Sequence, residues 1–148
     1  MTAITTDRDE IVRVVQLYID GFNHRDVNKF KEAFHEKAWI FFTDAEGVLH
    51  EALLTDYFEE WAASNTPEIK GRFISVEQAG DVAVVILGFD HAADMSPAWV
   101  DIHSLLKINS VWKIMNKTAT HCSRAGEAGT KESVRKGSRV QTAESSRT

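Results

Sequence analysis

The chain has 148 residues and a mass of 16.6 kDa, a length that fits one domain and excludes most two-domain enzyme designs. Hydrophobic residues make up 43% of it, enough to build a core and to exclude a fully disordered chain. The formal charge of −5 argues against a nucleic-acid partner, because phosphate backbones attract basic proteins. Its longest apolar runs are far shorter than the roughly 20 residues of a membrane helix, so we expect no membrane partner.

The two ends of the chain differ from its middle. The first ten residues are polar and acidic and lack the pattern of a secretory signal, and the single cysteine, Cys122, cannot form an internal disulfide. Both features predict a cytoplasmic protein. Residues 121–148 hold six lysines or arginines and three glutamates but only two valines. We therefore expect one domain over 1–120 and a polar, basic tail over 121–148 that is disordered or loosely docked.

Three helices are expected in the first half of the chain. Apolar residues at three- and four-residue spacing predict a helix from about Asp7 to Asn23, with Thr6 and Asp9 in a capping arrangement. Asp26 can cap a second, shorter helix. The segment from Glu51 to Ala63 also has helical spacing. The expected buried residues of the first and third helices are Ile11, Val14, Val15, Tyr18 and Phe22, and Leu54, Tyr57, Phe58 and Trp61, respectively.

The remaining segments have the composition of β-strands. A short strand at Trp39–Phe42 and its return at Val48–Leu49 precede the third helix. Four longer strands follow, and two-residue turns at Gly80-Asp81 and Asn109-Ser110 predict antiparallel hairpins. These strands are expected at Arg72–Gln78, Val82–His91, Trp99–Ile108 and Val111–Thr120. Segregated helices and strands of this kind predict an α+β domain in which helices cover one face of a curved, mostly antiparallel sheet.

The turn at Asn109-Ser110 predicts the register of the last hairpin. Regular pairing from this turn would place four polar residues on the inner face, among apolar ones. These residues are Asp101, His103, Asn116 and Thr118. The same register would turn Lys113 and Lys117 outward. Buried polar groups need partners, so the four either bond one another inside a core or face a pocket, and the sequence leaves both interpretations open.

Two segments resemble the NTF2-like superfamily. They are Tyr18–Asp26, followed by Phe34–Glu36, and the hairpin Leu105–Asn116, which is similar to the SnoaL-like branch and to the proteins labelled putative lumazine-binding. The resemblance implies a cone: a strongly curved sheet wrapped around a pocket that the N-terminal helices close. Isomerases, dehydratases, cyclases, hydrolases, binding proteins and scaffolds share this fold, so the fold alone does not select a function.

Individual positions carry part of this resemblance. Tyr18 stands where ketosteroid isomerases place an oxyanion-hole tyrosine, and His103 falls near their second donor. Phe42 occupies the place of their general-base aspartate and cannot accept a proton, which argues against that mechanism. A further set is similar to the pocket of the scytalone dehydratases: Tyr18, Tyr57, Asp101, His103 and Asn116.

Three functions are consistent with these residues. The first is a cofactor-independent isomerase, dehydratase or cyclase. Such an enzyme would be a lyase or isomerase that acts beside a carbonyl and needs no metal. In it His103, oriented by Asp101, is the general acid or base and Tyr18 donates a hydrogen bond. The second is a protein that binds a flat aromatic or hydrophobic ligand without catalysis. The expected ligand-binding residues are Phe22, Trp39, Tyr57, Trp61, Trp99, Asn116 and Thr118.

The third function is a scaffold that forms a homodimer through the outer face of the sheet. This face would carry an apolar patch formed by Val100, Ile102, Leu106 and Met115. Dimerisation is also compatible with the first two functions. A metal site of His91, Asp101 and His103 is a further, weaker alternative, since two histidines and one carboxylate can hold iron.

Overall fold

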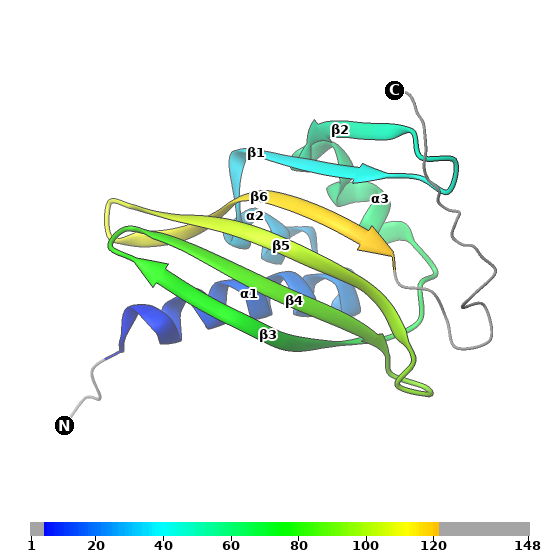
Figure 1. Ribbon diagram of the computed structural model, residues 1–148, viewed down its shortest axis with the longest axis horizontal. Helices are drawn as coiled ribbons and strands as arrows, with labels where there is room; N and C mark the ends of the chain where they lie inside the picture. The colour runs from blue at the N-terminus through cyan, green and yellow to red at the C-terminus, as the bar shows by residue number, and fades with distance from the viewer. Residues whose placement is uncertain (1–4, 122–148) are drawn as a thin grey trace.

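The computed structural model describes residues 5–121 and shows three helices, a 3-10 turn and six strands within that range. Of the predicted tail, all but His121 lies outside the described residues. Figure 1 shows the elements, whose bounds follow. They are α1 (Asp7–His24), α2 (Val27–Ala33), β1 (Phe34–Thr43), β2 (Leu49–Leu53), η1 (Leu54–Tyr57), α3 (Phe58–Ala63), β3 (Ile69–Ala79), β4 (Val82–His91), β5 (Pro97–Ile108) and β6 (Val111–His121).

Local hydrogen bonds set the start of the first two helices, as the sequence predicts. The Thr6 hydroxyl accepts from the backbone N–H of Asp9 at 3.1 Å, and the Asp9 carboxylate accepts from the backbone N–H of Thr6 at 3.3 Å. Asp26 caps α2 through the N–H of Asn28. All five apolar residues predicted for the inner side of α1 are buried. The predicted stripe of the first helix is therefore confirmed.

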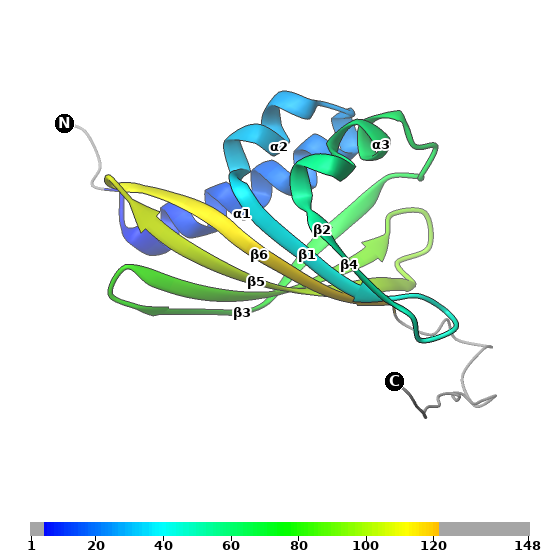
Figure 2. The ribbon, with the colours of Figure 1, turned by 90° about the horizontal axis from the view of Figure 1, so that it is seen from above.

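The six strands form one curved, unclosed sheet in the order β2-β1-β6-β5-β4-β3. Only the pairing of β1 with β6 is parallel. Figures 1 and 2 show the helices of residues 5–121 together on one face of this sheet, and none of them lies on its other face. This arrangement confirms the predicted α+β cone. None of the helices in the described part of the chain is long and apolar enough to cross a membrane.

The third predicted helix begins later than expected. Residues Glu51–Leu53 belong to β2, where Glu51 pairs with Phe41 and Leu53 with Trp39. The helical prediction for Glu51–Leu53 is wrong because pairing with β1 satisfies the backbone there. Helical structure starts at Leu54, so the predicted apolar stripe lies on η1 and α3. Strand β1 is also longer than predicted.

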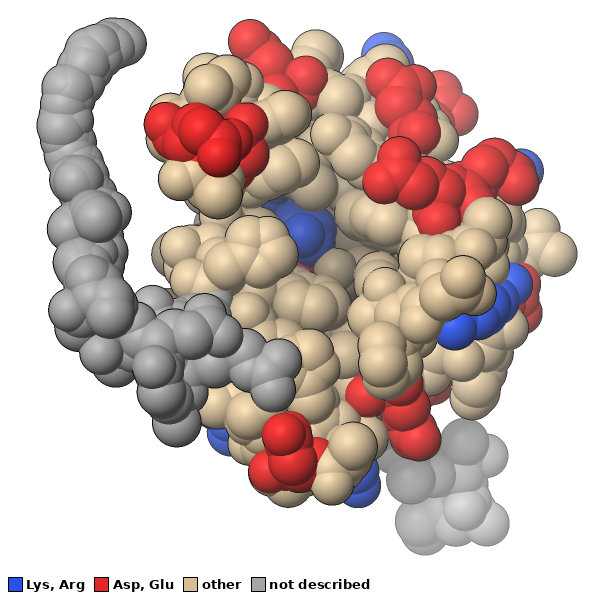
Figure 3. All heavy atoms as spheres, turned by 90° about the vertical axis from the view of Figure 1, so that its right-hand side faces the viewer, with Lys and Arg blue, Asp and Glu red and all other residues tan. Residues whose placement is uncertain are grey.

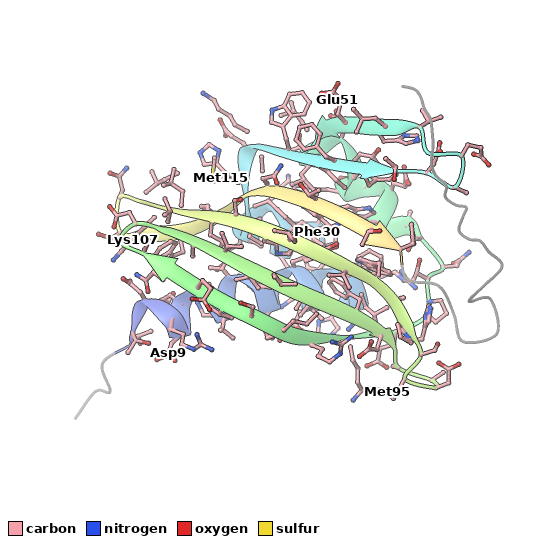
Figure 4. The ribbon with its side chains drawn as sticks, in the orientation of Figure 1. Asp9, Phe30, Glu51, Met95, Lys107 and Met115 are labelled. Atoms are coloured by element: carbon pink, nitrogen blue, oxygen red, sulfur yellow. The ribbon has the colours of Figure 1, made fainter. Side chains whose placement is uncertain are left out.

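A β-bulge at Met115 interrupts the last hairpin. Asn109 and Ser110 both have positive φ, as a tight two-residue hairpin turn requires, and the pairing of Leu105 with Ile114 is as predicted. The next pair is Ser104 with Asn116, which leaves Met115 without a partner on β5. Figure 4 labels Met115 where β6 passes the start of β1. The β1–β6 pairing shifts at the same place.

The bulge reverses the faces of the following residues. Beyond Met115, Lys117 points inward and is 5% exposed, whereas Thr118 is exposed on the outer face. The sequence-based register is therefore wrong from Asn116 onward, because an extra residue moves every later side chain to the opposite face. Asp101 and His103 do face inward, and both are fully buried.

Candidate functional site

A cavity of about 330 Å³ lies between the C-terminal half of α1, α3 and the ends of β5 and β6. Its walls are mainly aromatic, and Lys117 is the only lysine or arginine among the described residues that line it. Figure 3 shows a hollow at this end of the molecule, with basic atoms at its bottom and acidic side chains at several points around it. The lining residues are Tyr18, Phe22, Ile40, Phe42, Tyr57, Glu60, Trp61, Ser64, Thr66, Trp99, Lys117, Ala119, Thr120 and His121.

Asp101 is the centre of a polar cluster under this cavity. Its Oδ1 atom lies 3.3 Å from Nζ of Lys117, and its Oδ2 atom lies 3.2 Å from Nε2 of His103. The charge of the same carboxylate acts on the Tyr18 hydroxyl, which also interacts with the Trp99 side chain. The Lys117 ammonium also lies 5.6 Å from the centroid of the Trp61 ring, within range of a cation–π interaction.

Burial and charge set the protonation of this cluster. Burial alone would raise the pKa of Asp101, but the Lys117 ammonium and the hydrogen bond to His103 outweigh it, so the pKa lies below its usual value. Burial, followed by the negative charge of Asp101 and the hydrogen bond to it, raises the pKa of Tyr18 well above 10.0. At neutral pH the cluster therefore contains an ionised Asp101 and a protonated Tyr18.

His103 lies behind the cavity wall. Its ring packs against those of Tyr18 and Phe34 at centroid distances of 5.5 and 6.3 Å, and it is not among the residues that line the cavity. Its Nδ1 atom is buried and has no hydrogen-bond partner among the described residues. Of the three residues predicted to be catalytic, only Tyr18 reaches the cavity, whereas His103 contacts Asp101 from behind.

Four of the seven residues predicted to bind a ligand line the cavity, and three do not. Phe22, Tyr57, Trp61 and Trp99 form a continuous aromatic wall around Tyr18. The other three lie on the outer face of the sheet, where the Trp39 ring stacks on that of Phe41. Asn116 donates to the backbone oxygen of Trp39 at 3.3 Å, and the Thr118 hydroxyl donates to Asn116 at 3.0 Å. The predicted inward orientation of Asn116 and Thr118 is therefore wrong, because the bulge at Met115 turns both side chains outward. Trp39 is 42% exposed.

Lys117 is a site residue that the sequence pattern does not reveal. Regular alternation from the turn placed it outward with Lys113, and no pattern in the sequence marks a bulge at Met115. Phe42, which the resemblance places where ketosteroid isomerases have their general base, lines the cavity. Its ring stacks on that of His50 at 4.7 Å.

The weaker metal alternative finds no support from the positions of these side chains. Within residues 5–121, no three His, Cys, Asp or Glu side chains come together in a way that could hold a metal ion. Asp101 and His103 contact one another, while His91 pairs with Ile69 at the far end of β4.

Comparison with known families shows the family to which the chain belongs. Residues 6–119 match the family model described as putative lumazine-binding. The chain belongs to this family of NTF2-like proteins, as its cone-shaped fold and its pocket under the first helix also indicate. Among curated proteins, none matches the sequence.

Solved structures share the fold. An NTF2-like protein of unknown function from Shewanella baltica OS155 superposes with a TM-score of 0.71 at 22% identity, over 82% of this chain and 98% of that one. A second, from Methylobacillus flagellatus KT, has a TM-score of 0.68 at 23% identity, over 82% and 96% of the two chains. A ketosteroid isomerase-like protein from Erwinia carotovora atroseptica has a TM-score of 0.60 at 16% identity, over 81% and 99%. At these identities the likeness shows the fold alone.

Proposed function

We propose that this protein binds a small, flat aromatic ligand in the cavity and that the Lys117 ammonium donates a hydrogen bond to an oxygen atom of that ligand. The observation that carries the proposal is an aromatic cavity with one buried ammonium group at its wall. Its volume is within the range of small-molecule sites, and apolar walls with a few placed polar groups are typical of such sites.

The buried ion pair supports the same conclusion. Lys117 and Asp101 are 5% and 0% exposed, and removing two charges from water costs several kcal/mol per ion before their attraction is counted. An apolar pair would fill this space at lower cost. A protein that keeps a charged donor beside an aromatic cavity has a group ready to recognise a polar atom on an otherwise apolar molecule.

Catalysis beside a carbonyl is the second candidate. It is favoured by Tyr18, which its raised pKa keeps protonated, so that its single O–H can donate to an oxygen on which negative charge develops once it turns away from Asp101. The same raised pKa prevents Tyr18 from acting as a base, and Phe42 stands where related isomerases have one. The geometry therefore favours binding over turnover. Deuterium uptake by a bound ketone at the carbon next to its carbonyl, absent with Tyr18→Phe, would favour catalysis.

We also propose that two copies of the chain associate through the outer face of the sheet. Several large apolar side chains on this face are exposed, among them Trp39, Val84 and Ile102 at 42, 43 and 45%. Of the predicted patch, Ile102 is exposed, whereas Val100, Leu106 and Met115 are only partly exposed. Soluble proteins tend to avoid exposing several large apolar side chains on one face to water. This association leaves the cavity on the opposite, helical side free for a ligand.

Binding is tested with two matched tryptophan variants. Lumazine and naphthamide are titrated calorimetrically into the wild type, Trp61→Leu and Trp39→Leu. Trp61 lines the cavity, whereas Trp39 lies on the outer face. We expect Trp61→Leu to weaken the binding of at least one ligand by about tenfold, through the loss of about 1.5 kcal/mol of ring contact, and Trp39→Leu to leave it unchanged. Equal affinities in all three proteins, or no binding to the wild type, would contradict the proposal.

A further inference from the structure

We propose that Asp101 determines the charge of the ligand: by neutralising Lys117, it makes the cavity accept an uncharged ligand with a carbonyl oxygen and reject a carboxylate. The inference rests on the proposed function, because it concerns the same cavity. It goes further in assigning a specificity role to a residue that does not touch the ligand.

Positive and negative charges around the cavity balance one another. Lys117 is the only lysine or arginine among the described lining residues, and its Nζ atom lies 3.3 Å from Oδ1 of Asp101. Asp101 is fully buried, so water screens this pair little. Glu60 adds a negative charge to the lining itself. The site as a whole therefore offers no excess of positive charge, although a lysine lies at its wall.

The consequence for a ligand follows from solvation. A carboxylate entering the cavity would lose its hydration and meet an ammonium whose charge Asp101 already balances, so it would gain little attraction in return. A carbonyl oxygen has a much smaller hydration cost. It needs only one hydrogen bond, and the lysine ammonium has three N–H donors, of which Asp101 does not require all.

Asp101 is ionised in the folded protein at neutral pH. The Lys117 ammonium and the hydrogen bond to His103 outweigh the effect of burial and hold the pKa of Asp101 below its usual value. The ion pair of Lys117 and Asp101, which has no net charge, is thus present in the folded protein before any ligand binds.

The test compares two ligands that differ only in charge, naphthamide and naphthoate, by calorimetric titration at neutral pH. The wild type is compared with Asp101→Asn, which keeps the size of the side chain and removes its charge. Asp90→Asn is the matched control, because Asp90 is also buried, at 6% exposed, but binds Arg72 on the outer face. Circular dichroism checks that each variant is folded.

We expect the wild type and Asp90→Asn to prefer naphthamide to naphthoate by about tenfold or more, and Asp101→Asn to reverse this preference. The inference is overturned if naphthoate binds the wild type as tightly as naphthamide, or if Asp101→Asn leaves their ratio unchanged. If Asp101→Asn does not fold, the wild-type ratio decides. If lumazine and both naphthalene ligands fail to bind the wild type, the proposed function itself is wrong and the inference falls with it.

Discussion

Lys117 contacts Asp101 because Met115 is left out of the pairing between β5 and β6. Without this bulge, Lys117 would face outward with Lys113, and Asp101 would be buried without an ammonium partner. One extra residue thus converts a surface lysine into the charged group of the cavity. We expect both the stability of the protein and its proposed ligand binding to depend on this contact.

The first prediction concerns the stability of the buried pair. Lys117→Met should lower the free energy of unfolding by about 3 kcal/mol, because it leaves Asp101 buried without its counterion. Lys113→Met is the matched control. Lys113 lies on the outer side of the same strand, where its Nζ atom donates to the backbone oxygen of Glu32, and its loss should cost less than about 1 kcal/mol. Urea denaturation measures both.

The double variant sharpens this prediction. Asp101→Asn combined with Lys117→Met removes both charges, so the second change should recover part of the stability that the first one loses. If the double variant loses as much free energy of unfolding as the two single variants together, the two side chains do not interact, contrary to the 3.3 Å contact.

A second prediction concerns the ionisation of Tyr18. The chain has two tyrosines, so the Tyr57→Phe variant reports on Tyr18 alone. Burial and the nearby charge of Asp101 raise the pKa of Tyr18, and its phenolate absorbance should therefore appear only well above pH 10.0, together with unfolding. A reversible titration near pH 10.0 in the folded protein would show that Tyr18 is neither buried nor beside a carboxylate.

A third prediction concerns acid stability at the start of α1. The hydrogen bond from Lys107 at 3.0 Å, followed by those from Trp112 and Gln78, lowers the pKa of Asp7 below its usual 3.8. Figure 4 shows Lys107 and the first turn of α1, marked by Asp9, at the same end of the molecule. A lowered folded-state pKa stabilises the protein above the unfolded-state value, and this stabilisation is lost as the pH falls through the folded-state value.

The Asp7→Asn variant tests this linkage. Its free energy of unfolding should lie below that of the wild type at neutral pH, and the difference should shrink as the pH falls below 3.8. Denaturant unfolding at a series of pH values measures it. A difference that stays constant over this range would mean that the charge of Asp7 contributes nothing to stability.

A fourth prediction concerns self-association. Sedimentation at micromolar concentration should find the wild type as a dimer and Ile102→Glu as a monomer, because a charge at this half-exposed position of the outer face cannot be buried against a second copy. Val111→Glu is the control, since Val111 is similarly exposed at 48% but lies at the β5–β6 turn. A monomeric wild type would contradict the proposed dimer.

Much of the fold could be predicted because the determining signals are local. The apolar stripe of α1, the caps at Thr6 and Asp26, and the turn at Asn109-Ser110 each depend on a few neighbouring residues. The same holds for the aromatic wall, since Phe22 and Trp61 lie on the apolar sides of predicted helices. The spacing of apolar residues alone therefore predicts that these rings point inward.

The charged part of the site could not be predicted in the same way. The bulge at Met115 depends on how β6 fits between β1 and β5, and the β1 pairing shifts at the same point. Such a fit involves residues distant in sequence and leaves no periodic pattern. For this reason the sequence predicts Lys117 outward and Asn116 inward, and it does not indicate that His103 lies behind Tyr18.

The most direct test of ligand recognition is the dissociation constant of naphthamide for the wild type, Lys117→Met and Lys113→Met, measured by calorimetry on folded protein. A hydrogen bond from a charged donor contributes about 1.5–3 kcal/mol. The account predicts that Lys117→Met weakens binding by about tenfold or more, while Lys113→Met binds like the wild type. Equal dissociation constants for all three proteins would contradict it.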